Sequence, residues 1–132
     1  MSQNLKPLLE VKNLTREFPA GETTVQILKG VNLEIYPGEL VAIVGQSGSG
    51  KSTLVRLLNR LIEPSSGNIY IDETDITNLN DKELIDIRRK KISMVFQSFA
   101  LMPHMNILDN VSFGLELSGI EKSKRYEAAK YA

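Results

Sequence analysis

The sequence predicts an α/β fold in which an N-terminal antiparallel β subdomain precedes a strand, a glycine-rich loop and a helix. Three observations support this prediction. Apolar and polar residues alternate in two segments before residue 36, and Leu40–Val44 is a short continuous apolar run. Gly45–Thr53 is rich in glycine and is followed by apolar residues at helical spacing.

The first part of the chain is expected to form the β subdomain. Residues 1–7 are predicted to be a flexible tail. Leu8–Leu14 and Val25–Ile35 partly alternate between apolar and polar residues, as half-exposed strands do, and Pro19–Glu22 between them is a predicted turn. We therefore expect two or three antiparallel strands before the buried strand predicted at Leu40–Val44.

The glycine-rich segment matches the pattern of a phosphate-binding loop. Glycines lack Cβ atoms, so backbone N–H groups can approach a triphosphate, and the N-terminus of the next helix points at the same place. Lys51 adds a charge for the terminal phosphates, and the Ser52 hydroxyl suits Mg²⁺. The alternative is a Gly/Ser-rich linker. The pattern thus predicts a P-loop NTPase core whose nucleotide contacts are Gly45, Gln46, Ser47, Gly48, Ser49, Gly50, Lys51, Ser52 and Thr53.

Further elements are predicted after the loop. The loop leads into a helix over about 54–62, and strands are expected at Asn68–Asp72 and Ile92–Phe96. Asn80 and Glu83 have the spacing of a capping box, which predicts a helix from 81 to about 88. Pro103 interrupts an apolar loop at 98–105. Two more helices follow, one capped by Asn106 and ending near Leu117, the other starting near Glu121.

The composition limits the class of protein. Lys plus Arg and Asp plus Glu each number 16, so the formal net charge is zero and does not indicate a nucleic-acid partner. The chain has no cysteine, which excludes a disulfide, a thiol nucleophile and a zinc–cysteine site within it. No apolar run approaches the ~18 residues of a membrane span, so association with a membrane is expected to depend on another protein.

Residues outside the loop match one family, and the chain resembles the ATP-binding subunit of ABC transporters. Phe18 occupies the place of that family's adenine-stacking aromatic, Val31–Glu39 resembles its approach to the loop, and Val95–Gln97 resembles its Q-loop. An aromatic ring beside a nucleotide site offers a stacking face for adenine. The alternatives are a core aromatic for Phe18 and an ordinary polar loop residue for Gln97.

The resemblance covers about residues 8–119 and implies ATP and Mg²⁺ as cofactors. It implies that Phe18 and Val25 lie beside the nucleotide, in addition to the loop residues. Lys51 and Gln97 are the implied catalytic residues, and Ser52 and Gln97 the implied Mg²⁺ ligands.

Different segments of the chain resemble two different kinds of transporter. Residues 8–53 are most similar to exporters of the macrolide or lipoprotein-release type, whereas residues 54–119 are most similar to glycine betaine/proline importers. The second match is longer and covers the segment where a membrane subunit would dock. The resemblance therefore implies uptake of betaine-like quaternary amines, with a macrolide or lipoprotein-release exporter as the alternative.

The resemblance also implies which parts of the family this chain lacks. The family needs a strand ending in Asp-Glu (Walker B), a Leu-Ser-Gly-Gly-Gln signature and a switch histidine. Leu117–Gly119 matches only the first three signature residues, and His104 comes too early to be the switch histidine. Residues 8–132 are thus expected to be the N-terminal part of a nucleotide-binding domain, with an incomplete core that binds Mg-ATP weakly and hydrolyses it little.

Two protein partners are implied by the same resemblance. A second nucleotide-binding subunit would complete a dimer, and a transmembrane permease would dock near Ser98–His104, which contains Phe99, Leu101 and Met102. The alternative for these apolar residues is burial under a later part of the domain. The implied location is cytoplasmic, peripheral on the inner face of the cell membrane. Other classes remain open: a stand-alone P-loop kinase or GTPase, and a non-functional truncated product.

Overall fold

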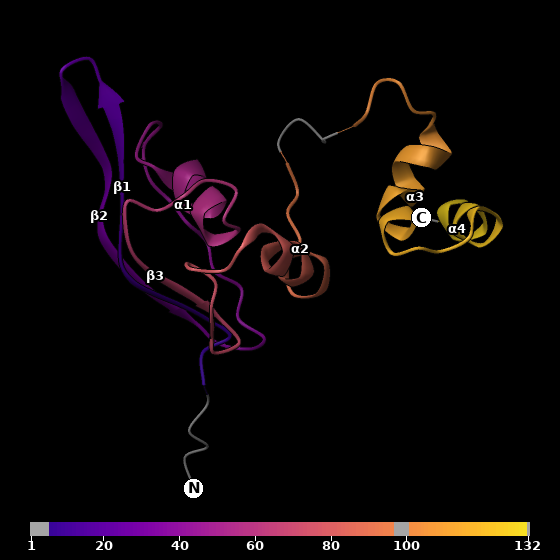
Figure 1. The fold of residues 1–132 in the computed structure, drawn as a ribbon, viewed down its shortest axis with the longest axis horizontal. Coiled ribbons are helices and arrows are strands. Elements are labelled where there is room, and N and C mark those ends of the chain that lie inside the picture. The colour runs from indigo at the N-terminus through magenta and orange to yellow at the C-terminus, as the bar shows by residue number, and fades with distance from the viewer. Residues whose placement is uncertain (1–5, 97–100, 132) are drawn as a thin grey trace, which may run out of the picture. The chain divides into compact units, whose positions relative to one another are not determined.

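The computed structural model describes residues 6–96 and 101–131 of the chain. These residues fall into two compact units, Met1–Ser93 and Met94–Ala132 (Figure 1). The described elements of the first unit are β1 (Leu9–Ala20), β2 (Thr23–Ile35), α1 (Lys51–Leu58), β3 (Ser66–Ile71), β4 (Thr74–Asp75) and α2 (Asp81–Lys90). Those of the second unit are α3 (Ile107–Leu117) and α4 (Lys122–Ala129).

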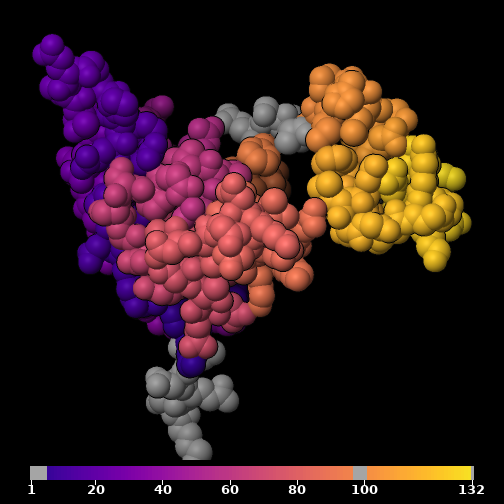
Figure 2. Space-filling view, viewed as in Figure 1, coloured from indigo at the N-terminus to yellow at the C-terminus, as the bar shows by residue number. Residues whose placement is uncertain are grey.

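An antiparallel sheet in the order β2-β1-β3-β4 is the base of the first unit. β1 and β2 form a hairpin in which Phe18 pairs with Val25, and β1 pairs on its other side with β3, where Val11 lies opposite Ile69. All residues from 17 to 26 are exposed, and Figure 2 shows the indigo tip of the hairpin protruding from its unit. The predicted N-terminal antiparallel β subdomain is confirmed.

The core of the first unit joins the sheet to both of its helices, which lie on the same side of the sheet in Figure 1. Leu54 and Leu57 face inward from α1, and Leu84 faces inward from α2, as expected for helices with one apolar face. Their buried partners are Val11, Leu14, Leu28, Ile69, Ile71 and Ile76. This packing holds α1, and therefore the loop that precedes it, against the hairpin.

Arg60 is a buried charge just after α1, only 7% exposed. Its guanidinium donates to the carbonyl oxygens of Ile76 and Thr77 and pairs with the Glu63 carboxylate at 2.8 Å. Arg88 of α2 donates in turn to the carbonyl oxygen of Arg60. These bonds tie the end of α1 to the segment that follows β4, and also to α2. The end of α1 is therefore anchored from two directions.

The capping box predicted for α2 is present. The Asn80 side chain accepts from the backbone N–H of Glu83 at 3.1 Å, and the Glu83 carboxylate accepts from the backbone N–H of Asn80 at 3.0 Å. We expect Asn80→Ala to lower the free energy of unfolding by about 1 kcal/mol, and Asn80→Gly to lower it by only a few tenths. Urea denaturation followed by circular dichroism measures both. Equal losses in the two variants would contradict the capping role.

Two predicted strands are wrong. Leu40–Val44 and Ile92–Phe96 pair with no strand in the part of the chain that the structure describes. Leu40 is 99% exposed and Val95 is 92% exposed. Apolar composition can favour a strand, but the ladder hydrogen bonds need a neighbouring strand, and the sheet of this chain ends at β2 and β4.

In the second unit, the Asn106 side chain caps α3 by accepting from the N–H of Asp109 at 2.9 Å, as predicted. Asn110 holds the preceding loop: its amide donates to the carbonyl oxygens of Met102 and Met105, both at 3.1 Å. Arg125 of α4 pairs with Glu116 of α3 at 3.0 Å. Both predicted helices are confirmed. None of the helices in residues 6–96 and 101–131 has the length and apolar character to cross a membrane.

Candidate phosphate-binding site

The predicted phosphate-binding loop leads directly into α1. Gly50 is the residue before the helix and has φ 91°, in the left-handed region. A Cβ atom at this position would lie 3.0 Å from Cγ2 of Ile27 and 3.1 Å from Cδ2 of Leu28. The loop therefore packs against β2 at a place where glycine satisfies both the backbone angle and the lack of space.

Lys51, the first residue of α1, turns back into the loop. Its Nζ donates to the carbonyl oxygens of Gly45 at 2.8 Å and Gln46 at 2.6 Å, and lies 3.4 Å from Oγ of Ser49. The backbone N–H of Ser49 also donates to the carbonyl oxygen of Gln46 at 3.2 Å, which closes the loop on itself. The ammonium is thus held by the loop, where it can neutralise an anion bound to the same backbone.

The loop and the first turn of α1 also offer backbone donors. Among the residues described, the N–H groups of Gly48, Lys51, Ser52 and Thr53 donate to no acceptor in the chain. A helix leaves its first N–H groups unpaired, and its dipole favours negative charge at that end. Together with the Lys51 ammonium, these donors suit a phosphate group.

A cavity of about 380 Å³ opens over the loop. Phe18 and Ile27 of the hairpin line it together with Ser47, Gly48, Lys51 and Ser52 of the loop and helix. The lining therefore combines an aromatic and an aliphatic side chain with backbone donors, hydroxyls and an ammonium. Such a cavity suits a ligand with a flat base at one end and an anionic tail at the other.

The remaining predicted contacts have other positions. Gly45, Gln46 and Ser49 belong to the loop but contact Lys51 rather than line the cavity, and Val25 is 48% exposed on the hairpin outside the cavity lining. Gln97 lies outside the described residues. Ile27 lines the cavity but was not predicted. The sequence did hold a signal for Ile27, since the adjacent apolar pair Ile27–Leu28 interrupts the alternation of apolar and polar residues along β2. Both residues are apolar because Leu28 is buried in the core and Ile27 lines the cavity.

The donor atoms near the loop fit a metal ion that arrives with a phosphate. Ser52 is exposed, and Mg²⁺ usually takes one or two protein oxygens and completes its shell with phosphate oxygens and water. Within 6–96 and 101–131, no group of three or more His, Cys, Asp or Glu residues could hold a metal ion. The Ser52 hydroxyl is one of the side-chain oxygens in the lining of this cavity.

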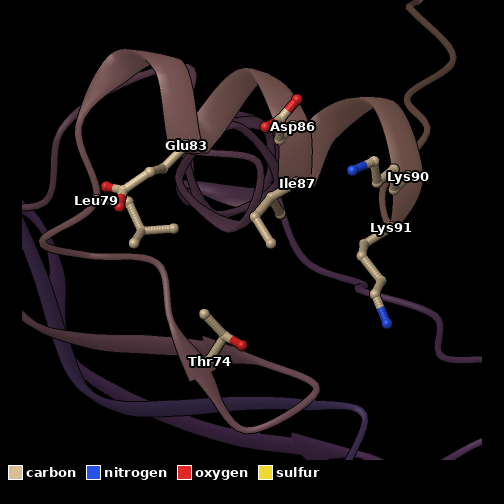
Figure 3. A pocket seen from close by; sticks show the side chains of 7 residues that line it. All are labelled: Thr74, Leu79, Glu83, Asp86, Ile87, Lys90 and Lys91. Carbon is tan, nitrogen blue, oxygen red and sulfur yellow. The ribbon is translucent and has the colours of Figure 1, made fainter.

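A second hollow, of about 290 Å³, lies between β4 and α2 (Figure 3). It is lined by Thr74, Leu79, Glu83, Asp86, Ile87, Lys90 and Lys91. Its charged groups are partly engaged already: Glu83 completes the capping box, and Lys91 forms an ion pair with Asp72 that lowers the pKa of that carboxyl through its hydrogen bond. We place the functional site at the loop, where an ammonium and the start of a helix line one cavity.

Known proteins are similar to this chain in sequence and in fold. The family model described as ABC transporter matches residues 28–131. The glycine betaine/proline betaine transport system ATP-binding protein ProV of Escherichia coli is 60% identical in an alignment 141 residues long that covers 92% of this chain and 35% of ProV. The macrolide export ATP-binding/permease protein MacB of Hahella chejuensis is 44% identical over 124 residues, covering 94% of this chain and 19% of MacB.

A solved structure, the dimeric post-hydrolysis state of the ATP-binding cassette MJ0796 bound to ADP and Pi, superposes with a TM-score of 0.87. It is 40% identical, and the match covers 93% of this chain and 54% of the cassette. The chain thus spans about a third of ProV and about half of the cassette.

Proposed function

The chain belongs to the ABC transporter family, and on that premise we propose that it is the nucleotide-binding portion of a transporter's ATP-binding subunit. It has the fold of an ATP-binding cassette, a P-loop NTPase fold, of which it covers about half. One observation supports nucleotide binding above all: Phe18 lines the same cavity as a loop that holds the Lys51 ammonium.

Each part of the cavity has a proposed role. The N–H groups of the loop and of the first turn of α1 hold the phosphates, and Lys51 exchanges its bonds to the Gly45 and Gln46 carbonyls for bonds to phosphate oxygens. Phe18 stacks on the adenine, and Ser52 binds Mg²⁺. Bound ATP supplies the phosphoanhydride bond whose hydrolysis energises transport. Gln97 would join the metal ligands, and Val25 would contact the nucleotide from the hairpin.

We further propose that the transporter takes up glycine betaine-like quaternary amines. The support is the higher identity to the betaine-transport relative, 60% for ProV against 44% for MacB. The partners would be a second nucleotide-binding subunit and a permease at the inner face of the cell membrane. Leu101, in the described part of the proposed docking segment Ser98–His104, is 67% exposed. Co-expression with a betaine permease or a macrolide-export permease, followed by co-purification, distinguishes the importer from the exporter.

Nucleotide binding is tested most directly by thermal unfolding with Mg-ATP. A ligand that binds only the folded state, present at ten times its Kd, raises the free energy of unfolding by about 1.4 kcal/mol. For a domain of about 100 residues this corresponds to a rise in Tm of roughly 5–10 °C. AMP, which lacks the β- and γ-phosphates, should give a much smaller shift. Phosphate release should stay near the rate without protein, because no Asp-Glu pair follows Gln97. A Tm that Mg-ATP leaves unchanged would contradict the proposal.

A further inference from the structure

We propose that Arg16 is a positioning residue that holds the Phe18 ring for stacking on a purine base, an inference that rests on the proposed ATP binding. The guanidinium carbon of Arg16 lies 4.4 Å from the centroid of the Phe18 ring. This is within the ~6 Å range in which a cation is attracted to an aromatic face. Both residues belong to β1 and are two positions apart, on either side of the register shift between Arg16 and Glu17 in the β1–β2 ladder.

The Arg16 side chain is itself anchored. Its Nη1 donates to the carbonyl oxygen of Glu63 at 2.7 Å. The Glu63 carboxylate pairs with the buried Arg60, so the anchor continues into the core of the first unit. Nε of Arg16 is buried and, among the described residues, has no hydrogen-bond partner. The guanidinium is thus held beside the ring by its hydrogen bond to the Glu63 carbonyl oxygen, in addition to its attraction to the ring.

The strand around Arg16 is also tied to the segment that follows α1. The backbone N–H of Ser65 donates to the carbonyl oxygen of Thr15 at 3.0 Å, and the Ser65 hydroxyl accepts from the N–H of Glu17 at 3.0 Å. Beyond this point the hairpin is exposed, and Phe18 is the first apolar residue of the exposed part. Arg16 is therefore anchored immediately before the exposed part of the hairpin that carries Phe18.

This arrangement has a consequence for the base. An aromatic ring has two faces, and the guanidinium takes one of them. The ring remains 36% exposed and lines the cavity over the loop, so the other face is left for stacking. A ring that is already held loses less freedom when a base stacks on it. Arg16 should thus raise affinity for the base while leaving affinity for the phosphates unchanged.

Calorimetric titration of the full chain with two ligands tests this proposal. Mg-ATP has a base, whereas Mg-tripolyphosphate has only the anionic tail. We expect Arg16→Met, which keeps an unbranched stem but removes the cation, to weaken Mg-ATP by about 3- to 10-fold and to leave Mg-tripolyphosphate within about twofold. Arg16→Lys, which keeps a cation, should restore part of the loss.

A double-mutant cycle adds a readout that a merely structural role would not produce. If Arg16 acts through the ring, the double variant of Arg16→Met and Phe18→Ala should bind Mg-ATP no more weakly than Phe18→Ala alone. Unchanged or tighter ATP binding by Arg16→Met would overturn the proposal, and so would a parallel loss of tripolyphosphate. Failure of the wild-type chain to bind Mg-ATP would instead contradict the proposed function, and this inference with it.

Discussion

Lys51→Ala is expected to lower the affinity for Mg-ATP and the affinity for Mg-tripolyphosphate alike, by about 100-fold or more. Within residues 6–96 and 101–131, the ammonium is the one side-chain cation in the lining of the loop cavity. In the ligand complex it would give charge-assisted hydrogen bonds, each worth roughly 1.5–3 kcal/mol, so losing two of them accounts for this factor. The loss should be the same for both ligands because the ammonium is proposed to bind the phosphates that Mg-ATP and Mg-tripolyphosphate share.

A matched control is Lys82→Ala. Lys82 is an exposed lysine in the first turn of α2, away from the cavity lining, and its removal changes the net charge by the same amount. Its affinity for both ligands should stay within about twofold, because exposed charges act weakly through water. Isothermal titration of both variants gives the comparison. Equal affinity in Lys51→Ala and the wild type would refute the nucleotide site.

Gly67→Ala is expected to lower the free energy of unfolding by about 3–5 kcal/mol. Gly67 lies in β3 with φ 90°, where an L side chain is strained. A Cβ atom would also lie 2.5 Å from the carbonyl oxygen of Asn13 and 2.6 Å from that of Lys12. These are backbone atoms of β1 at the register shift of the β1–β3 ladder, so the clash can be relieved only by moving the two strands apart.

Gly30→Ala separates the effect of backbone strain from the effect of the steric clash. Gly30 in β2 has φ 79°, but nothing lies within 4 Å of the position that a Cβ would take. This variant should therefore show the backbone strain alone, about 1–2 kcal/mol. Urea denaturation of both variants measures the difference, which is the contribution of the β1–β3 approach. If both glycines gave the same loss, close strand packing at Gly67 would be ruled out.

Local patterns predicted much of the fold because the forces behind them act over a few residues. Asn80 and Glu83 cap α2, and Asn106 caps α3, through bonds across three positions. The loop predictions at Gly50 and Lys51 depend on the same short range. Helix ends and loop geometry are thus within reach of sequence reasoning whenever the partners are covalent neighbours.

The strands predicted at Leu40–Val44 and Ile92–Phe96 failed for the opposite reason. Their apolar composition is real, but in the residues described they have no neighbouring strand and remain largely exposed. The chain covers 54% of the solved cassette it resembles. A strand is a property of at least two segments, so its own residues cannot decide whether its ladder forms.

The sequence by itself determined that residues 45–53 have the pattern of a phosphate-binding loop, because the spacing of Gly45, Gly50, Lys51 and Ser52 sets which donors lie together. Only the tertiary structure decided that Phe18 and Ile27 share a cavity with that loop, and that a guanidinium lies on the Phe18 ring. The cavity joins segments distant along the chain, and the guanidinium on the ring is held by the carbonyl oxygen of Glu63 although Arg16 is only two positions from Phe18. Both arrangements depend on sheet register and core packing, and no local pattern of residues encodes either.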